Sequence, residues 1–168
     1  PLAYLSFTKH RPIIISASNY VTRRNLINRV LPALNGWLPF RISYTSAQSN
    51  ANYLDLNRFV DSLKSKFTRF RLLKAKILIW LTMTTTGNLP ELYLSPRIPY
   101  LSEIRQLPKP FRTKSSFGYS FLKLQAKRVR QANFVIVSHD FLIHHAKQLS
   151  RLGSHPILII DECTQLPK

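Results

Sequence analysis

The chain has 168 residues, which is enough for one domain with a sizeable hydrophobic core. It carries 25 Lys and Arg against 7 Asp and Glu, so its formal net charge is +18. This excess favours a polyanionic partner, most often nucleic acid, with an anionic membrane surface as the competing partner. A single cysteine, Cys163, excludes an intramolecular disulfide and a multi-cysteine metal site. The sequence shows neither a signal-peptide pattern nor a membrane-spanning apolar run, so we expect a cytoplasmic protein without membrane association.

The N-terminal part predicts a β-α-β unit. Residues 12–16, Pro-Ile-Ile-Ile-Ser, form a short apolar run that is typical of a buried strand. Apolar residues then recur at helical spacing over residues 21–34, with Ser18 or Asn19 as the candidate helix cap. Residues 40–44 alternate between apolar and polar, which predicts a second strand. Such a unit is typical of a parallel α/β sheet.

The central part predicts a basic, mainly helical region. Residues 53–64 and 69–84 both show helical spacing of apolar residues, with Arg and Lys between them in the second. Residues 94–116 are rich in proline and predict loops around a short helix at residues 101–107. Residues 119–131 then predict a basic helix.

The C-terminal part returns to an α/β pattern, with strands at residues 134–137 and 157–160 on either side of a helix at 140–149. The sequence therefore predicts an α/β fold with a parallel sheet that a mainly helical insertion interrupts. We expect the boundaries to divide the chain into residues 1–46, 47–131 and 132–168.

Two acidic residues, Asp161 and Glu162, follow the last predicted strand directly. Open α/β sheets bind their ligands at the carboxyl ends of the strands. In P-loop NTPases an Asp at this position holds the Mg²⁺ of the nucleotide, and a neighbouring Glu can orient or deprotonate the attacking water. The chain contains no G-x-x-x-x-G-K-[ST] loop and only four glycines, so the phosphate cradle of such a site is missing from it.

Residues 133–167, NFVIVSHDFLIHHAKQLSRLGSHPILIIDECTQLP, resemble the DinG-type branch of the superfamily-2 helicases, which is related to XPD. In that family one strand ends in Asn-His, and a second ends in a DEAH box. Here Ser138-His139 stands in the first place, and the tetrapeptide that begins at Asp161 stands in the second.

Segments earlier in the chain resemble the same family. Residues 11–34 are similar to its motif Ia strand and helix, and residues 1–7 to the helix after its Walker A lysine. Residues 49–59 and 72–92 resemble the insertion of its Gram-positive members. The resemblance covers nearly the whole chain, and it implies a partial RecA-like domain that extends from just after Walker A to just past Walker B.

The resemblance implies a fragment of an ATP-dependent DNA helicase that couples ATP hydrolysis to movement on single-stranded DNA and is inactive in isolation. ATP and Mg²⁺ would be the cofactors, and a second RecA-like domain would complete the site. A fused exonuclease domain is compatible with this family. Asp161 would hold Mg²⁺, and Glu162 would be the catalytic residue that activates water. The expected nucleic-acid contacts are Ser16, Ser18, Asn19, Arg69, Arg71, Lys74, Lys76 and His139.

The chain departs from the family pattern in three places. Cys163 and Thr164 replace Ala and His in the box, which puts the coupling of hydrolysis to DNA in question. Ser138 stands where Asn is usual. Iron–sulfur members place four cysteines in the insertion, the first near Asp55, and this insertion has none, so we expect no cluster.

Other interpretations of the same residues stay open at this point. A non-enzymatic, basic nucleic-acid-binding module is the main alternative, but it has no need of an acidic pair at a strand tip. A metal-dependent nuclease would need more acids at strand ends. A metal site with His139, His144 and His145 is disfavoured, because adjacent helical residues cannot face one centre. Short side chains such as Ser16 and Ser18 suit a phosphate as well as a helix cap. We expect four residues to be packed in the interior: Cys163, Trp80, Tyr53 and Phe59.

Overall fold

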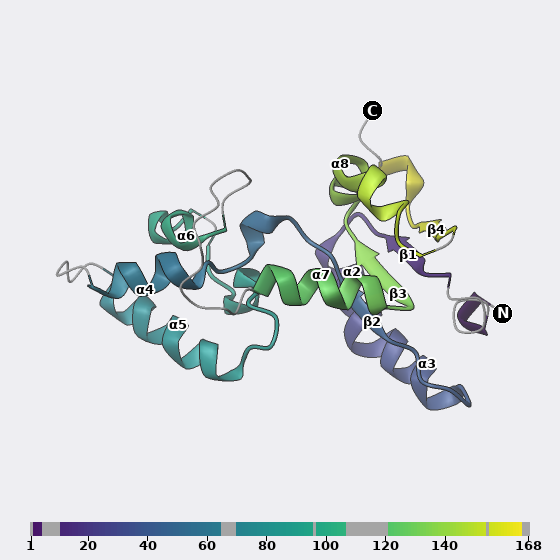
Figure 1. Cartoon of the computed structure of the whole chain (residues 1–168), viewed down its shortest axis with the longest axis horizontal. Coiled ribbons are helices and arrows are strands. Elements are labelled where there is room, and N and C mark those ends of the chain that lie inside the picture. Colours follow the sequence, from purple (N-terminus) through teal and green to yellow (C-terminus); the bar gives the residue numbers. More distant parts are fainter. Residues whose placement is uncertain are drawn as a thin grey trace. The chain divides into compact units, whose positions relative to one another are not determined.

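The computed structural model describes residues 2–4, 11–64, 70–95, 97–106, 121–153 and 155–165. The chain forms two compact units, which Figure 1 shows with their elements labelled. The first, here called the sheet unit, comprises Pro1–Gln48 and Ala126–Lys168. The second, here called the helical unit, comprises Ser49–Gln125.

The sheet unit is built on four parallel strands in the order β2-β3-β1-β4. Short runs of β-branched residues form the inner strands, and β3 is buried at every position, as expected for a strand covered on both faces. This confirms the predicted α/β class with a parallel sheet, and the arrangement is consistent with a partial RecA-like fold. The strands are β1 (Ile13–Ser16), β2 (Tyr44–Ser46), β3 (Phe134–Val137) and β4 (Ile157–Ile160).

Helices cover both faces of this sheet. On one face, side chains of a π-helical turn (Leu26–Val30), which follows α2 (Tyr20–Asn25), and of α3 (Leu31–Trp37) pack with alternate residues of β1 and β3. On the other face, residues from the end of α7 (Phe121–Gln131) and from α8 (His139–Leu149) pack with the remaining ones. The alternation of side chains along each strand thus gives the sheet unit two apolar layers.

The helical unit has its own core. It contains α4 (Leu56–Lys64), α5 (Arg71–Met83), α6 (Pro99–Ile104), the beginning of α7, and 3-10 turns at Asn50–Asn52 and Leu89–Leu92. The expected packing of Tyr53, Phe59 and Trp80 is confirmed, since all three belong to this core. Residues 107–120, where the sequence predicts the end of a proline-rich loop, lie outside the described residues.

The second strand of the predicted β-α-β unit is present, but its predicted bounds of 40–44 are wrong, because β2 begins only at Tyr44. The Ile42 amide donates to Asn35 Oδ1 at 2.7 Å, and the Ile42 carbonyl accepts from Asn35 Nδ2 at 3.0 Å. The Ser43 amide donates to Asn133 Oδ1 at 2.9 Å. Side chains thus satisfy both backbone groups of Ile42 and the Ser43 amide, which a strand would use for its ladder. Pairing with β3 starts at the Ser43 carbonyl, which accepts from the Phe134 amide at 3.0 Å. Among the described helices, none combines the length and apolar character that crossing a membrane requires.

Candidate functional site

The carboxyl edge of the sheet is held together by the chain that leaves β1. The Ala17 amide donates to the Val137 carbonyl at 3.1 Å, and the Asp161 amide donates to the Ser16 carbonyl at 2.9 Å. Backbone pairing therefore continues one step past the ends of β1 and β4. Asp161 is brought beside the end of β1, at the edge where parallel α/β sheets bind ligands.

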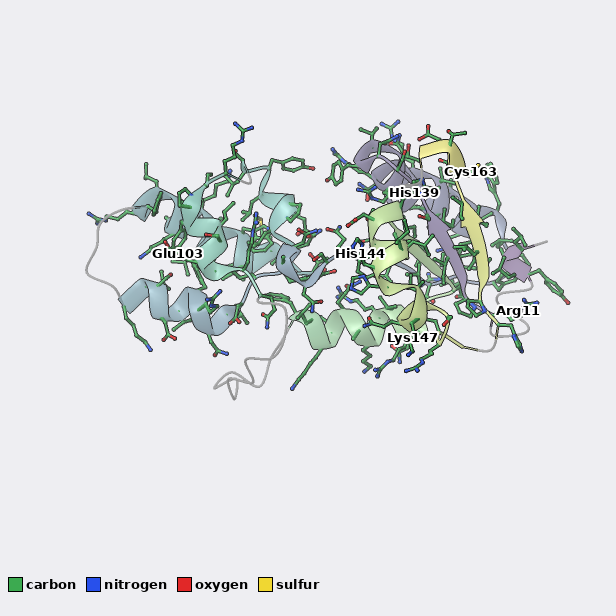
Figure 2. The ribbon with its side chains drawn as sticks, turned by 90° about the horizontal axis from the view of Figure 1, so that it is seen from above. Arg11, Glu103, His139, His144, Lys147 and Cys163 are labelled. Atoms are coloured by element: carbon green, nitrogen blue, oxygen red, sulfur yellow. The ribbon has the colours of Figure 1, made fainter. Side chains whose placement is uncertain are left out.

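Ser16 and His139 form a buried polar pair at this edge. Ser16 Oγ lies 2.7 Å from His139 Nδ1, and the exposed fractions of the two residues are 0% and 4%. His139 Nε2 is buried without a hydrogen-bond partner. Figure 2 shows His139 and Cys163 at one end of the sheet unit and Arg11 at the other. Arg11 lies before β1 in the sequence, with only Pro12 between them. The side chains of Ser16 and His139 thus connect the ends of β1 and β3 in the interior of the unit.

Ser138 has a different task in the structure. It is the N-cap of α8, and its Oγ accepts a hydrogen bond from the Phe141 amide at 3.1 Å. Serine is among the preferred residues at this position, because its short side chain reaches an otherwise unpaired amide of the first helical turn. The capping bond orients the start of α8 and with it the adjacent His139.

Asp161 and Glu162 are exposed at the tip of β4, and Glu162 is hydrogen-bonded to the loop after β1. Ser18 Oγ donates to Glu162 Oε2 at 2.5 Å, whereas the residues are 144 positions apart in the sequence. Glu162 has a φ of +50°, a left-handed conformation that costs a residue other than glycine free energy. Both carboxylates are on the surface.

The loop that carries Ser18 is anchored by Arg23 and Asn19. Arg23 Nη1 donates to the carbonyls of Ala17 and Ser18 at 2.8 and 2.9 Å. Burial lowers the pKa of the Arg23 guanidinium from its ordinary value. Asn19 Oδ1 accepts from the Thr22 amide at 2.7 Å, so Asn19, and not Ser18, caps α2. The role of Arg23 could not be predicted from the sequence, because a basic residue after a strand gives no sign of which carbonyls it will bind.

The candidate basic contacts belong to the helical unit. Arg71 and Lys76 are exposed on α5. Lys74 is half-buried: its Nζ donates to the Ser62 carbonyl at 2.5 Å and lies 5.7 Å from the centroid of the Tyr100 ring. Lys74 is therefore already bound within the unit. Arg69 lies outside the described residues.

The donor chemistry of the edge fits a nucleotide-bound magnesium ion better than a metal held by protein alone. Within the described part of the chain, no group of three or more His, Cys, Asp and Glu side chains could hold a metal ion. His144 and His145 instead donate from Nδ1 to helix carbonyls four residues earlier. Magnesium bound with phosphates needs only one or two carboxylates, and the exposed Asp161 provides one.

The expected packing of Cys163 is wrong, since its side chain is exposed in the turn after β4.

The chain matches no protein-family model. It is similar to curated proteins named "3'-5' exonuclease DinG", with 28% identity over 158 residues for the protein of Staphylococcus saprophyticus and 28% over 160 residues for that of Staphylococcus epidermidis. The protein of Staphylococcus aureus strain USA300 is 27% identical over 158 residues. The alignments cover 92%, 94% and 92% of this chain, whereas the chain spans 17% of the length of each relative. These matches support the relation to the DinG family that the motifs imply.

Proposed function

We propose that the chain is part of the first RecA-like domain of a DinG-type enzyme that couples ATP hydrolysis to movement along single-stranded DNA. The observation that carries the proposal is the exposed pair Asp161 and Glu162 at the tip of β4 in an all-parallel sheet. Ligands of such sheets bind at this edge. The 17% share of the relatives' length supports a place within a longer protein.

In this proposal the two acids have separate tasks. Asp161 coordinates the Mg²⁺ of bound ATP, and this ion neutralises charge on the phosphates. Glu162 orients a water molecule and accepts its proton. The chain contains no glycine-rich phosphate loop, so we propose that a preceding segment and a second RecA-like domain of the longer protein complete the site.

Two parts of the chain are the proposed DNA contacts, each within its own unit. In the sheet unit it is the loop of residues 17–19 after β1, here called the β1 loop, and in the helical unit it is the basic helix α5. Ser18 is half-buried and Asn19 exposed, so their side chains can reach a phosphate. Exposed Arg71 and Lys76 add positive charge. The burial of Ser16 and His139 gives these two a supporting role in the proposal.

The printed name of the relatives describes a 3'-5' exonuclease. We place such an activity in a separate domain of the longer protein, because the carboxyl edge described above lacks a cluster of three metal-binding side chains. The net charge of +18 also suits a module that binds nucleic acid without catalysis. The two functions differ in their need for the acidic pair.

The test is ATP hydrolysis by the longer protein with single-stranded DNA and Mg²⁺. Glu162→Gln should lower the hydrolysis rate by about 100-fold or more while ATP affinity stays within about twofold, because the amide cannot accept the proton. Asp140→Asn, which removes an exposed carboxylate from α8, is the control and should hydrolyse ATP normally. Wild-type hydrolysis by the Glu162→Gln variant would show that the acidic pair is not catalytic. A wild-type protein that binds DNA and hydrolyses no ATP would favour the non-enzymatic module.

A further inference from the structure

The hydrogen bond between Ser18 and Glu162 connects the proposed DNA-binding loop with the proposed catalytic acid. We propose that Ser18 is a positioning residue that holds the Glu162 carboxylate while the β1 loop is free and releases it when the loop binds a phosphate. The inference rests on the proposed function, and it adds a means by which nucleic acid regulates that site.

The Ser18 hydroxyl can donate only one hydrogen bond at a time. A serine hydroxyl has one proton to donate, while a carboxylate and a phosphodiester oxygen can only accept. In the structure Ser18 Oγ donates this proton to Glu162 Oε2 at 2.5 Å. The hydroxyl therefore cannot serve Glu162 and a DNA phosphate at the same time. Binding of a phosphate to Ser18 and retention of Glu162 are mutually exclusive.

The rest of the β1 loop is held by hydrogen bonds. Replacing Glu162 by a phosphate as the acceptor therefore requires movement of the Ser18 side chain only. The guanidinium of Arg23 holds the carbonyls of Ala17 and Ser18, and the Ala17 amide is paired with β3. Asn19 Oδ1 accepts the capping bond from the Thr22 amide, which fixes the orientation of this side chain. A rotation about the Ser18 Cα–Cβ bond can thus change the acceptor without moving the backbone. The Arg23 cation beside the loop also favours an incoming anion.

On the acceptor side, Glu162 is poised to move once it is released. Its φ of +50° is unfavourable for a residue with a side chain, and its carboxylate is exposed to water. The Ser18 bond helps to hold this conformation. When the bond is lost, the backbone can relax, and the carboxylate becomes free to accept a hydrogen bond from water. Nucleic-acid binding would in this way make the catalytic base available.

Affinity for a labelled oligothymidylate, measured by fluorescence anisotropy on the whole 168-residue chain at fixed salt, tests the competition. The variants are Glu162→Ala, Ser18→Ala, the double variant and Ser18→Thr, and Asp161→Ala is the control for loss of one neighbouring charge. Removing the competing acceptor should make Glu162→Ala bind about threefold or more tightly than Asp161→Ala. Ser18→Ala should weaken binding, and Ser18→Thr, which keeps a hydroxyl, should restore it.

The double variant Ser18→Ala/Glu162→Ala distinguishes two explanations for tighter DNA binding. One is that Glu162 competes with the phosphate for Ser18, and the other is that Glu162 only repels the phosphate by its charge. If Ser18 mediates the effect, Glu162→Ala in the Ser18→Ala background should tighten binding no more than Asp161→Ala does. Equal tightening by Glu162→Ala in both backgrounds would overturn the inference and leave DNA binding intact. A wild-type chain that binds no oligonucleotide would instead overturn the proposed function, and the inference with it.

Discussion

Glu91 accepts three side-chain hydrogen bonds in the helical unit. Trp80 Nε1 and Thr84 Oγ1 donate to Glu91 Oε2 at 3.3 and 3.0 Å, and the Thr86 hydroxyl donates to Oε1. Thr84 Oγ1 in turn accepts from the Gly87 amide at 3.1 Å. One half-buried carboxylate thus ties the end of α5 to the turn that follows it. The two threonines and the tryptophan would lose a charged acceptor without it.

Glu91→Ala should therefore lower the free energy of unfolding by about 2 kcal/mol, since hydrogen bonds to a charged group contribute about 1.5–3 kcal/mol. Glu103→Ala removes an exposed carboxylate from α6 of the same unit and should change this free energy by no more than about 0.5 kcal/mol. Urea denaturation followed by tryptophan fluorescence and circular dichroism measures both values. Equal midpoints for the two variants would show that the Glu91 contacts add no stability.

At the scale of elements, the sequence predicts what depends on local pattern. The strands at residues 134–137 and 157–160 match their apolar runs, and α8 follows from helical spacing. The start of β2 could not be predicted, because the side chain of Asn35 occupies the backbone groups of Ile42. Periodicity does not show which side chain will take a backbone hydrogen bond.

The candidate site divides in the same way. Asp161 and Glu162 could be identified because they directly follow an apolar strand. The bond from Ser18 to Glu162 and the bond between Ser16 and His139 join residues 144 and 123 positions apart. Such contacts follow from strand order, which a single sequence does not determine. The regulatory role of Ser18 could therefore be inferred only from the structure, whereas Asp161 and Glu162 could be identified from the sequence.

Gly87 permits close packing between two elements of the helical unit. Its φ of +67° is in the left-handed region, and a Cβ atom there would lie 2.1 Å from Phe121 Cγ. The ring of Phe121, the first residue of α7, thus packs directly against the glycine. A larger residue would meet both an unfavourable backbone conformation and a displaced aromatic ring.

Gly87→Ala should lower the free energy of unfolding by about 2–3 kcal/mol, because both strain and overpacking act at this position. Gly36→Ala makes the same chemical change in α3, where the added Cβ would meet no atom within 4 Å. It should raise the free energy of unfolding by about 0.5 kcal/mol, since alanine has the higher helix propensity. Urea denaturation of the two variants and the wild type measures the difference. A Gly87→Ala variant as stable as Gly36→Ala would contradict the packing account.

At the scale of the whole molecule, the excess of positive charge cannot be neutralised within the chain, which has 25 basic and 7 acidic residues. Basic side chains are exposed on α5 and on α7, and neither helix contains an acid. Each of these helices can attract a polyanion. The strength of this effect can be measured through its dependence on salt, because each neutralised phosphate releases condensed counterions.

The wild-type chain should bind single-stranded DNA without sequence preference and with a steep salt dependence. For about four to six phosphate contacts the slope of log affinity against log salt should be about −3 to −4, at roughly −0.7 per contact. The double variant Arg71→Gln/Lys76→Gln should make this slope shallower by about 1.4. Lys147→Gln/Arg151→Gln is the control with equal loss of charge, and Lys147 lies at the end of the sheet unit opposite His139 (Figure 2). This control variant should leave the slope nearly unchanged.

A flat salt dependence of the wild type, or an equal effect of both double variants, would mean that the charges of α5 keep the protein soluble and do not contact DNA. Binding to anionic vesicles without binding to DNA would instead identify a membrane surface as the partner of these charges.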